Sequence, residues 1–194
     1  MNKSKKNCLK KKSNILQKIK KVKGTRDLLG NQIILHNNII AKFVRLCKSL
    51  NFSQISTPIL EYSEIFTKSL GLSSDIVSKE MYNFEDQGKE RLVLRPEGTA
   101  AIARAIITNS IEQDLNKFFY YGPMFRRERP QSGRLRQFHQ VGVEYIGSDN
   151  YLADLEVIIL AEEFLKDLKI RQKLVLQINS LGNEITRKKY NKLL

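Results

Sequence analysis

The chain has 194 residues, of which 41% are hydrophobic, enough for one domain with a hydrophobic core. Its 34 lysines and arginines outnumber 20 acidic residues, which gives a formal net charge of +14. No run approaches the ~18 apolar residues of a membrane span, and Cys8, Cys47, His36 and His139 are spaced neither as a disulfide framework nor as a metal site. We therefore expect a reduced, cytoplasmic protein with no membrane segment and no bound structural metal.

The positive charge is concentrated at the N-terminus. Residues 1–23 contain ten lysines and no acidic residue, which leaves 24 basic and 20 acidic residues for the remainder of the chain. Residues 1–22 are predicted to be a solvated, disordered arm. A non-specific contact with nucleic-acid phosphates is a second interpretation. A transit peptide is a third, and the absence of arginine from this stretch disfavours it.

Apolar residues at helical spacing predict an amphipathic helix over residues 31–50. A short strand is predicted at residues 51–60, where Pro58 favours a sheet edge or the end of a strand. Residues 63–70 are predicted to form a short helix, with Ser63 as its N-cap.

The rest of the chain alternates between strand and helix patterns. Two short strands around a polar turn predict a β-hairpin at residues 81–97. The elements predicted after it are a helix at 97–110, strands at 118–128 and 136–147, a helix at 151–168, a strand at 173–180 and the start of a helix at 183–194. Strands joined by tight turns, with helices between the hairpins, are typical of an α+β fold with an antiparallel sheet flanked by helices.

The hairpin at residues 118–147 contains five arginines, namely Arg126, Arg127, Arg129, Arg134 and Arg136. Because side chains alternate between the two faces of a strand, Arg126 and Glu128 share one face. By the same rule, a single face of the second strand carries Phe138, Gln140, Gly142 and Glu144. His139 falls on the opposite, apolar face, where we expect it to pack or to form hydrogen bonds rather than to act as a general base.

This set of side chains suits a nucleotide bound beside a small zwitterion. A guanidinium matches phosphate oxygens, Phe138 offers a surface for a purine, and Gly142 leaves room for a bulky group. Glu144 is able to accept hydrogen bonds from a cationic ligand. The pattern alone leaves two alternatives open: the arginines are solvated or paired with Glu128 and Glu144, or the hairpin is an RNA-binding ribbon in which Phe138 stacks on a base.

A second candidate stretch is LRPEGTA, residues 94–100. Pro96 ends the preceding strand, and Gly98 permits an unusual backbone angle or the close approach of a ligand. Glu97 lies where the strand gives way to a helix. Its carboxylate therefore either binds an ammonium group or favours the start of the helix.

Together these stretches resemble the histidyl-tRNA synthetases, a family of class II aminoacyl-tRNA synthetases. KGTRD at residues 23–27 is similar to the family's opening signature, and FSQISTPILEYSEIF at residues 52–66 resembles motif 1, the dimer-forming element. LRPEGTA resembles the amino-acid-binding loop. GPMFRRERPQSGRLRQFHQVGVE, residues 122–144, is similar to motif 2 and is the most specific match. The resemblance extends from residue 23 to about residue 183 and implies the catalytic core of a class II synthetase.

For ATP, the resemblance implies a role for four residues of the hairpin. Arg126 would be the catalytic residue that holds the α-phosphate. Glu128 would contact the adenine end, and Phe138 would stack on adenine. Arg134 would reach the β- and γ-phosphates from the loop.

For L-histidine, the resemblance implies two groups of contacts. Glu97, Gly98 and Thr99 would hold the α-ammonium group. Gln140 would lie between the amino acid and the phosphate, and Glu144 would face the imidazole. The implied activity is that of a histidine–tRNA ligase, which activates L-histidine with ATP, accompanied by Mg²⁺, and transfers it to tRNA(His). The family assembly would be a homodimer formed through motif 1.

Later family segments find no match before Leu194. They include motif 3, a second arginine that faces the phosphates, and the anticodon-binding domain. We therefore expect residues 23–178 to be the N-terminal part of an incomplete catalytic core, residues 179–194 to begin a truncated helical segment, and the isolated chain to be inactive. Two rival functions remain: a catalytically silent regulatory paralogue of the family in histidine biosynthesis, and an RNA-binding module made of the lysine-rich arm and the arginine hairpin.

Overall fold

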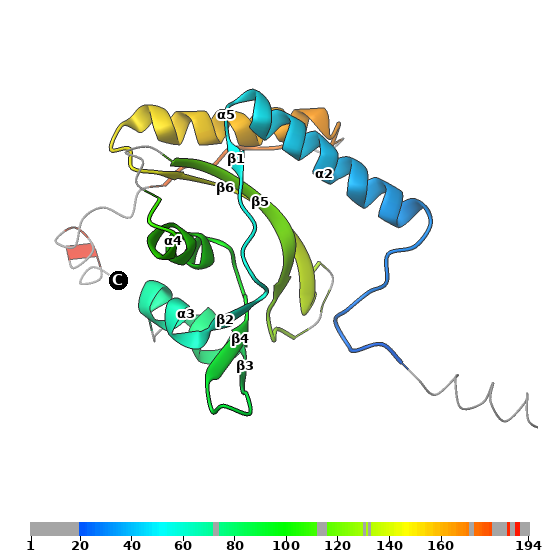
Figure 1. Cartoon of the computed structure of the whole chain (residues 1–194). Helices are drawn as coiled ribbons and strands as arrows, with labels where there is room; N and C mark the ends of the chain where they lie inside the picture. The colour runs from blue at the N-terminus through cyan, green and yellow to red at the C-terminus, as the bar shows by residue number, and fades with distance from the viewer. Residues whose placement is uncertain are drawn as a thin grey trace, which may run out of the picture.

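Figure 1 shows the computed structural model of the chain, an α+β protein in which two small sheets are surrounded by helices. The structure describes residues 20–71, 74–111, 116–129, 131, 133–170, 173–179, 186 and 189–190. The elements in chain order are α2 (Asn31–Ser49), β1 (Ser53–Gln54), β2 (Leu60–Tyr62), α3 (Ser63–Leu70), the π-helical turn η1 (Ile76–Glu80), β3 (Tyr82–Glu85), β4 (Arg91–Leu94), α4 (Thr99–Thr108), β5 (Asn116–Phe125), β6 (Gln137–Ile146) and α5 (Tyr151–Asp167). The predicted fold class is confirmed.

The first sheet has the strand order β1-β5-β6 and is built around the long antiparallel β5–β6 hairpin. Helices α2 and α5 lie together over one face of this sheet (Figure 1). Phe43 and Cys47 of α2 pack there against Phe119, and Leu160 and Phe164 of α5 complete the same buried cluster. The apolar side chains on this face of β6, which are Val141, Val143 and Tyr145, pack against that cluster. The apolar face predicted from alternation is therefore confirmed.

Helix α4 lies on the other side of the same sheet (Figure 1). Its Ile102 is buried against Tyr120 and Met124 of β5. Three of its alanines, Ala100, Ala101 and Ala105, are also buried. Small side chains allow the helix to approach the sheet closely, so the first turn of α4 sits beside the hairpin.

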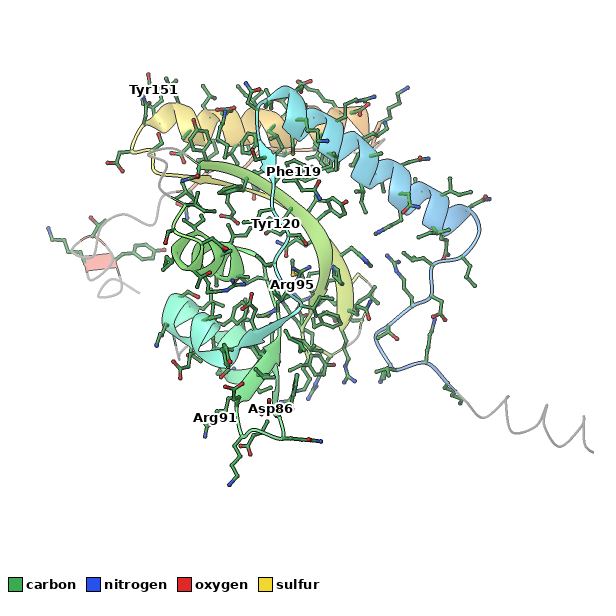
Figure 2. All side chains as sticks on the ribbon, in the orientation of Figure 1. Asp86, Arg91, Arg95, Phe119, Tyr120 and Tyr151 are labelled. Atoms are coloured by element: carbon green, nitrogen blue, oxygen red, sulfur yellow. The ribbon has the colours of Figure 1, made fainter. Side chains whose placement is uncertain are left out.

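Arg95 joins the second sheet, of strand order β2-β4-β3, to the first. Its side chain is only 6% exposed, and Figure 2 shows it in the interior of the molecule. Its Nη1 donates to the carbonyl oxygen of Thr57 at 2.8 Å, and its Nε donates to that of Pro123 in β5 at 3.1 Å. The backbone N–H of Phe125 donates to the carbonyl oxygen of Arg95 at 3.1 Å. A buried guanidinium with these partners fixes segment 94–100 against β5.

The predicted elements from residue 31 to residue 168 are present, with shifted ends. The predicted first strand is divided into β1 and β2, with Pro58 between them. The predicted cap at Ser63 is wrong: Tyr62 precedes α3 and Ser63 is its first residue, because β2 runs directly into the helix. β5 ends at Phe125, so Arg126 and Glu128 lie just beyond the strand.

The predicted strand at residues 173–180 is not formed over residues 173–179, which the structure describes. Leu174, Val175 and Leu176 are 53%, 71% and 68% exposed there. An apolar alternation becomes a strand only where a neighbouring strand pairs with it, and no described strand pairs with these residues.

Of the last predicted helix, residues 186, 189 and 190 are helical. The predicted arm at residues 1–22 lies mostly outside the described residues. Within the described part of the chain, no helix is long and apolar enough to cross a membrane.

Candidate active site

The register of the β5–β6 hairpin places the predicted binding residues on one face. Met124 pairs with Phe138, Tyr120 with Gly142, and Phe118 with Glu144. Directly paired residues of antiparallel strands point to the same side of the sheet. We call this side the even-numbered face. The backbone N–H of Arg126 donates to the carbonyl oxygen of Arg136 at 3.0 Å, which extends the ladder by one pair and keeps Arg126 beside Phe138.

Arg126 is held in place without being neutralised. Its Nε donates to the carbonyl oxygen of Pro96 at 3.0 Å, and its guanidinium carbon lies 5.3 Å from the centre of the Phe138 ring. The ring and the carbonyl fix the orientation of the guanidinium. Arg126 forms no ion pair with any carboxylate that the structure describes. A fixed, unpaired guanidinium on an aromatic ring is a suitable site for a phosphate.

The other arginines of the hairpin have different surroundings. Arg134 pairs with Glu128 at 3.1 Å, so the interpretation in which arginines pair with hairpin carboxylates holds for this one. Arg136 packs on Gly24, and its backbone N–H donates to the Gly24 carbonyl oxygen at 2.7 Å. This contact attaches the KGTRD segment to the start of β6. The roles of Glu128 with adenine and of Arg134 with the outer phosphates stay predictions.

Glu97 and Thr99 connect the start of α4 to β6. Both carboxylate oxygens of Glu97 accept from backbone N–H groups of the first turn, from Thr99 at 2.6 Å and from Ala100 at 3.0 Å. The Thr99 hydroxyl donates to Oε1 of Glu144 at 2.7 Å. Glu97 is therefore a helix cap in this structure, one of the two interpretations of its position, and its contact with an ammonium group stays a prediction.

Glu144 carries a carboxylate that its surroundings make costly to ionise. Burial raises the pKa of Glu144, and the negative charge of Glu97 raises it further, while the hydrogen bond from Thr99 lowers it. A cation bound beside these carboxylates would offset the repulsion between them and favour their ionised forms. The pair thus favours a positively charged ligand at this end of the even-numbered face.

Gln140 lies between the two ends of this face, opposite Gly122. Its Oε1 is buried and has no hydrogen-bond partner among the described residues. Buried polar atoms normally have a partner, so an orphaned amide oxygen is a reason to expect a bound donor. An ammonium group is one such donor.

Tyr120 is the residue of the site that the sequence did not indicate. A Cβ atom placed on either Gly98 or Gly142 would lie 2.4 Å from its ring. The bulky group that Gly142 accommodates is therefore the chain's own phenol. Of the two reasons given for a glycine at position 98, the unusual backbone angle does not apply, since Gly98 has an ordinary negative φ of −102°. Burial raises the pKa of Tyr120 to about 12, with smaller contributions from Glu144 and Glu97. The glycine opposite an aromatic residue in the hairpin is the only sequence signal for this packing.

His139 lies on the opposite face of the hairpin from the predicted binding residues. It contacts His36 of α2 edge to face, with ring centres 4.4 Å apart, as expected for a packing histidine.

The described residues contain no cluster of three or more His, Cys, Asp or Glu side chains able to hold a metal ion. The Mg²⁺ expected with ATP stays a prediction, and no step below depends on it.

Comparison with known proteins agrees with this geometry. The family model for histidyl-tRNA synthetase matches residues 24–188. The chain belongs to the histidyl-tRNA synthetase family. Its matched range begins at Gly24, which anchors the hairpin, and contains every residue of the even-numbered face discussed above. The resemblance inferred from KGTRD, LRPEGTA and the arginine hairpin is thereby confirmed at the level of the family.

Relatives and solved structures support the same family. The histidine–tRNA ligase of Gluconobacter oxydans is 46% identical over 89% of this chain and 42% of its own length. The crystal structure of Staphylococcus aureus histidyl-tRNA synthetase without ligands is 35% identical, with a TM-score of 0.71 over 90% of this chain and 40% of that one. A Bacillus halodurans protein described as an ATP phosphoribosyltransferase regulatory subunit/histidyl-tRNA synthetase is 29% identical, with a TM-score of 0.69 over 80% of this chain and 39% of its own. The chain thus spans about two fifths of the length of these proteins.

Proposed function

We propose that this chain provides the histidine- and ATP-binding surface of a histidine–tRNA ligase. L-Histidine would be activated by ATP to histidyl-adenylate, and the histidyl group would then pass to tRNA(His). The observation that carries the proposal is the arrangement of the even-numbered face. An unpaired guanidinium, that of Arg126, lies at one end, the half-buried carboxylate of Glu144 lies at the other, and the orphaned amide oxygen of Gln140 lies between them.

In the proposed complex, Arg126 holds the α-phosphate of ATP. Its Nε is used by Pro96, which leaves its two terminal nitrogens for phosphate oxygens. The Phe138 ring under the guanidinium would continue as a stacking surface for adenine. Because the guanidinium is already oriented, little side-chain freedom is lost when the phosphate binds.

Histidine would bind at the opposite end of the same face. Its α-ammonium group would donate to the Gln140 amide oxygen and lie beside Glu97 and Thr99. Its imidazole N–H would point to Glu144, whose pKa is raised chiefly by burial and further by the charge of Glu97. Gly98 and Gly142 would serve this site indirectly, since both hold the Tyr120 ring that separates the first turn of α4 from β6.

The chemistry requires no covalent nucleophile from the protein. The histidine carboxylate attacks the α-phosphorus of ATP, the bond to the β-phosphate oxygen breaks, and pyrophosphate leaves with that electron pair. The two reacting groups are both anions and repel each other. The contribution of the chain is to hold them at one place and to stabilise the charge that develops on the α-phosphate through Arg126.

We also propose that the isolated chain is inactive in this reaction and that the active form is a cytoplasmic homodimer. With Arg134 engaged by Glu128, the described hairpin leaves Arg126 as the guanidinium oriented on the even-numbered face. One phosphate contact is a weak clamp for a triphosphate. The relatives whose printed name is histidine–tRNA ligase are more than twice as long as the matched segment, which is consistent with further contributions to their sites.

Titration of L-histidine into the isolated chain tests the binding part of the proposal. Glu144→Gln is expected to weaken histidine binding about tenfold, because a charged hydrogen bond to the ligand is lost. It is also expected to raise the melting temperature slightly at neutral pH, because burial makes the ionised carboxylate costly to the free protein. Calorimetric titration and thermal unfolding measure the two effects.

The pH dependence follows from the raised pKa of Glu144. As the pH falls through this raised value, the carboxylate becomes protonated, so histidine affinity is expected to be lost at a higher pH than for an ordinary glutamate. The Glu144→Gln protein should lack that component of the pH dependence. Glu162→Gln, which changes an exposed glutamate of α5, is the matched control and should leave affinity unchanged. Equal histidine binding by the wild-type and Glu144→Gln proteins would rule out the proposed orientation of the ligand.

A further inference from the structure

The face of the hairpin opposite the proposed active site borders a hollow. It has a volume of about 450 Å³ and lies between α2 and the odd-numbered side of β5 and β6. Among the residues that line it are Arg26, His36, Ile39, Tyr121, Leu135 and His139. We call it the α2 groove. Phe138 and Gln140 of the even-numbered face also reach it, so a test of the groove has to distinguish the two faces.

The charges around the α2 groove all have one sign. Arg26 contributes a permanent cation, and His36 and His139 contribute two imidazoles in contact, with ring centres 4.4 Å apart. None of the described residues that line the groove is acidic. The chain has no other histidine, so both of its imidazoles meet at this one place.

The electrostatic surroundings of His139 agree with this view. Partial desolvation lowers the pKa of His139, and the nearby His36 and Arg26 lower it further. Tyr121 is the remaining titratable group among the residues that line the groove. An anion placed against Arg26 and the imidazoles would reverse the repulsion and favour their protonation.

The volume and the lining of the groove indicate the size of the ligand and the nature of the part attached to its phosphate. Its volume lies within the range of about 300–1,000 Å³ typical of small-molecule sites. Ile39, Leu135 and Val141 supply apolar surface, and the Tyr121 ring, whose residue is 38% exposed, supplies a flat face. Cationic and hydrogen-bonding groups beside apolar and aromatic walls match a phosphate attached to a planar body.

We propose that the α2 groove binds a nucleotide-sized phosphorylated ligand, with the phosphate against Arg26, His36 and His139 and the planar body against Tyr121. Protonation of the imidazoles strengthens the contact, so binding takes up protons and is tighter at slightly acid pH. The groove adjoins the proposed active site at Phe138 and Gln140, but Tyr121 and His139, which would contact the ligand, lie on the odd-numbered face of the hairpin.

Binding to the groove can be followed by NMR through the two imidazoles themselves, since they give the only histidine ring signals of the untagged chain. AMP, inorganic phosphate and adenosine are titrated separately into the isotope-labelled chain, at about pH 6 and about pH 8. AMP is expected to shift both ring signals at the lower pH and to raise both imidazole pKa values. Inorganic phosphate should do so at higher concentration, and adenosine should have little effect. At about pH 8 the AMP affinity should be several-fold weaker.

Substitutions locate the binding on the odd-numbered face. Arg26→Gln is expected to weaken AMP binding about tenfold, because it removes a charge-assisted contact. Arg26 is exposed, so the substitution should leave the fold intact. Arg91→Gln, which changes an arginine of the other sheet, is the matched control and should bind as the wild type does. Arg126→Gln should leave the ring shifts intact even if nucleotide binding on the even-numbered face is lost.

Three results would overturn the proposal. The first is the absence of any ring shift with AMP beyond that given by sodium chloride at equal ionic strength. The second is an unchanged AMP affinity in the Arg26→Gln protein. The third is loss of the ring shifts in the Arg126→Gln protein, which would mean that the imidazoles report a ligand bound on the other face.

Discussion

Replacing Arg126 by alanine is expected to slow histidine-dependent pyrophosphate exchange by at least about a hundredfold wherever this chain supports the reaction. The guanidinium is the unpaired cation that Phe138 and Pro96 hold on the even-numbered face. Its loss would leave the α-phosphate charge without its proposed partner. The exchange assay is run on the isolated chain and on a fusion to the unmatched part of the Gluconobacter oxydans ligase, since the match covers 42% of that protein.

Arg129→Ala is the control for this result. Arg129 is an exposed arginine of the same hairpin, and its loss should change the exchange rate less than about threefold, as is usual for an exposed surface charge. Arg126→Lys is expected to restore only part of the rate, because an ammonium group cannot make the same forked contact. An Arg126→Ala protein that exchanges pyrophosphate at the wild-type rate would contradict the proposed role.

Replacing Gly142 by alanine is expected to destabilise the fold by about 3 kcal/mol, at the upper end of the usual cost of overpacking. The added methyl would lie 2.4 Å from the Tyr120 ring, which is 7% exposed and which a Cβ on Gly98 would also meet at 2.4 Å. A buried ring in such close contact with two backbone segments cannot shift without disturbing its neighbours. Urea unfolding of the wild-type and Gly142→Ala proteins measures the difference in the free energy of unfolding. The comparison requires that the unfolding free energies of both proteins depend on urea concentration with the same slope, which the unfolding curves themselves show.

A double-mutant cycle assigns this cost to the Tyr120 contact. In a Tyr120→Ala background, Gly142→Ala is expected to cost less than about 1 kcal/mol, because the clash is gone. Gly88→Ala serves as the control, since a Cβ there meets only the flexible Asp86 side chain at 3.3 Å. The same destabilisation by Gly142→Ala in the presence and the absence of the ring would contradict this packing.

Alternation and spacing were sufficient to predict the main elements and the common face of Phe138, Gln140 and Glu144. The β5–β6 hairpin is long and its apolar face is covered by α2 and α5, so a register with the opposite parity would have buried Arg126 and Glu144. The exposed stretch at residues 173–179 shows the limit of such reasoning. Its pattern favours a strand, but pairing depends on a neighbour that the pattern does not specify.

The sequence could not indicate which arginines of the hairpin are available to a ligand. Arg134 is engaged by Glu128 and Arg136 packs on Gly24, whereas Arg126 has no ionic partner among the described residues. These differences arise from contacts between segments that lie far apart along the chain. Arg95 of the LRPEGTA stretch is a further case, because it is buried and joins the two sheets through contacts with Thr57 and Pro123.

The claim that histidine and ATP meet on the even-numbered face is tested most directly by mapping a bound, non-hydrolysable analogue of histidyl-adenylate by NMR. Side chains of the two faces serve as internal reporters in one sample. The Thr99 methyl, the Gln140 side-chain amide and the Met124 methyl are expected to shift together, while the Val143 methyls, which pack against the buried cluster of α2 and α5, stay in place. Saturable shifts on the odd-numbered face, with none at Thr99 and Met124, would contradict it.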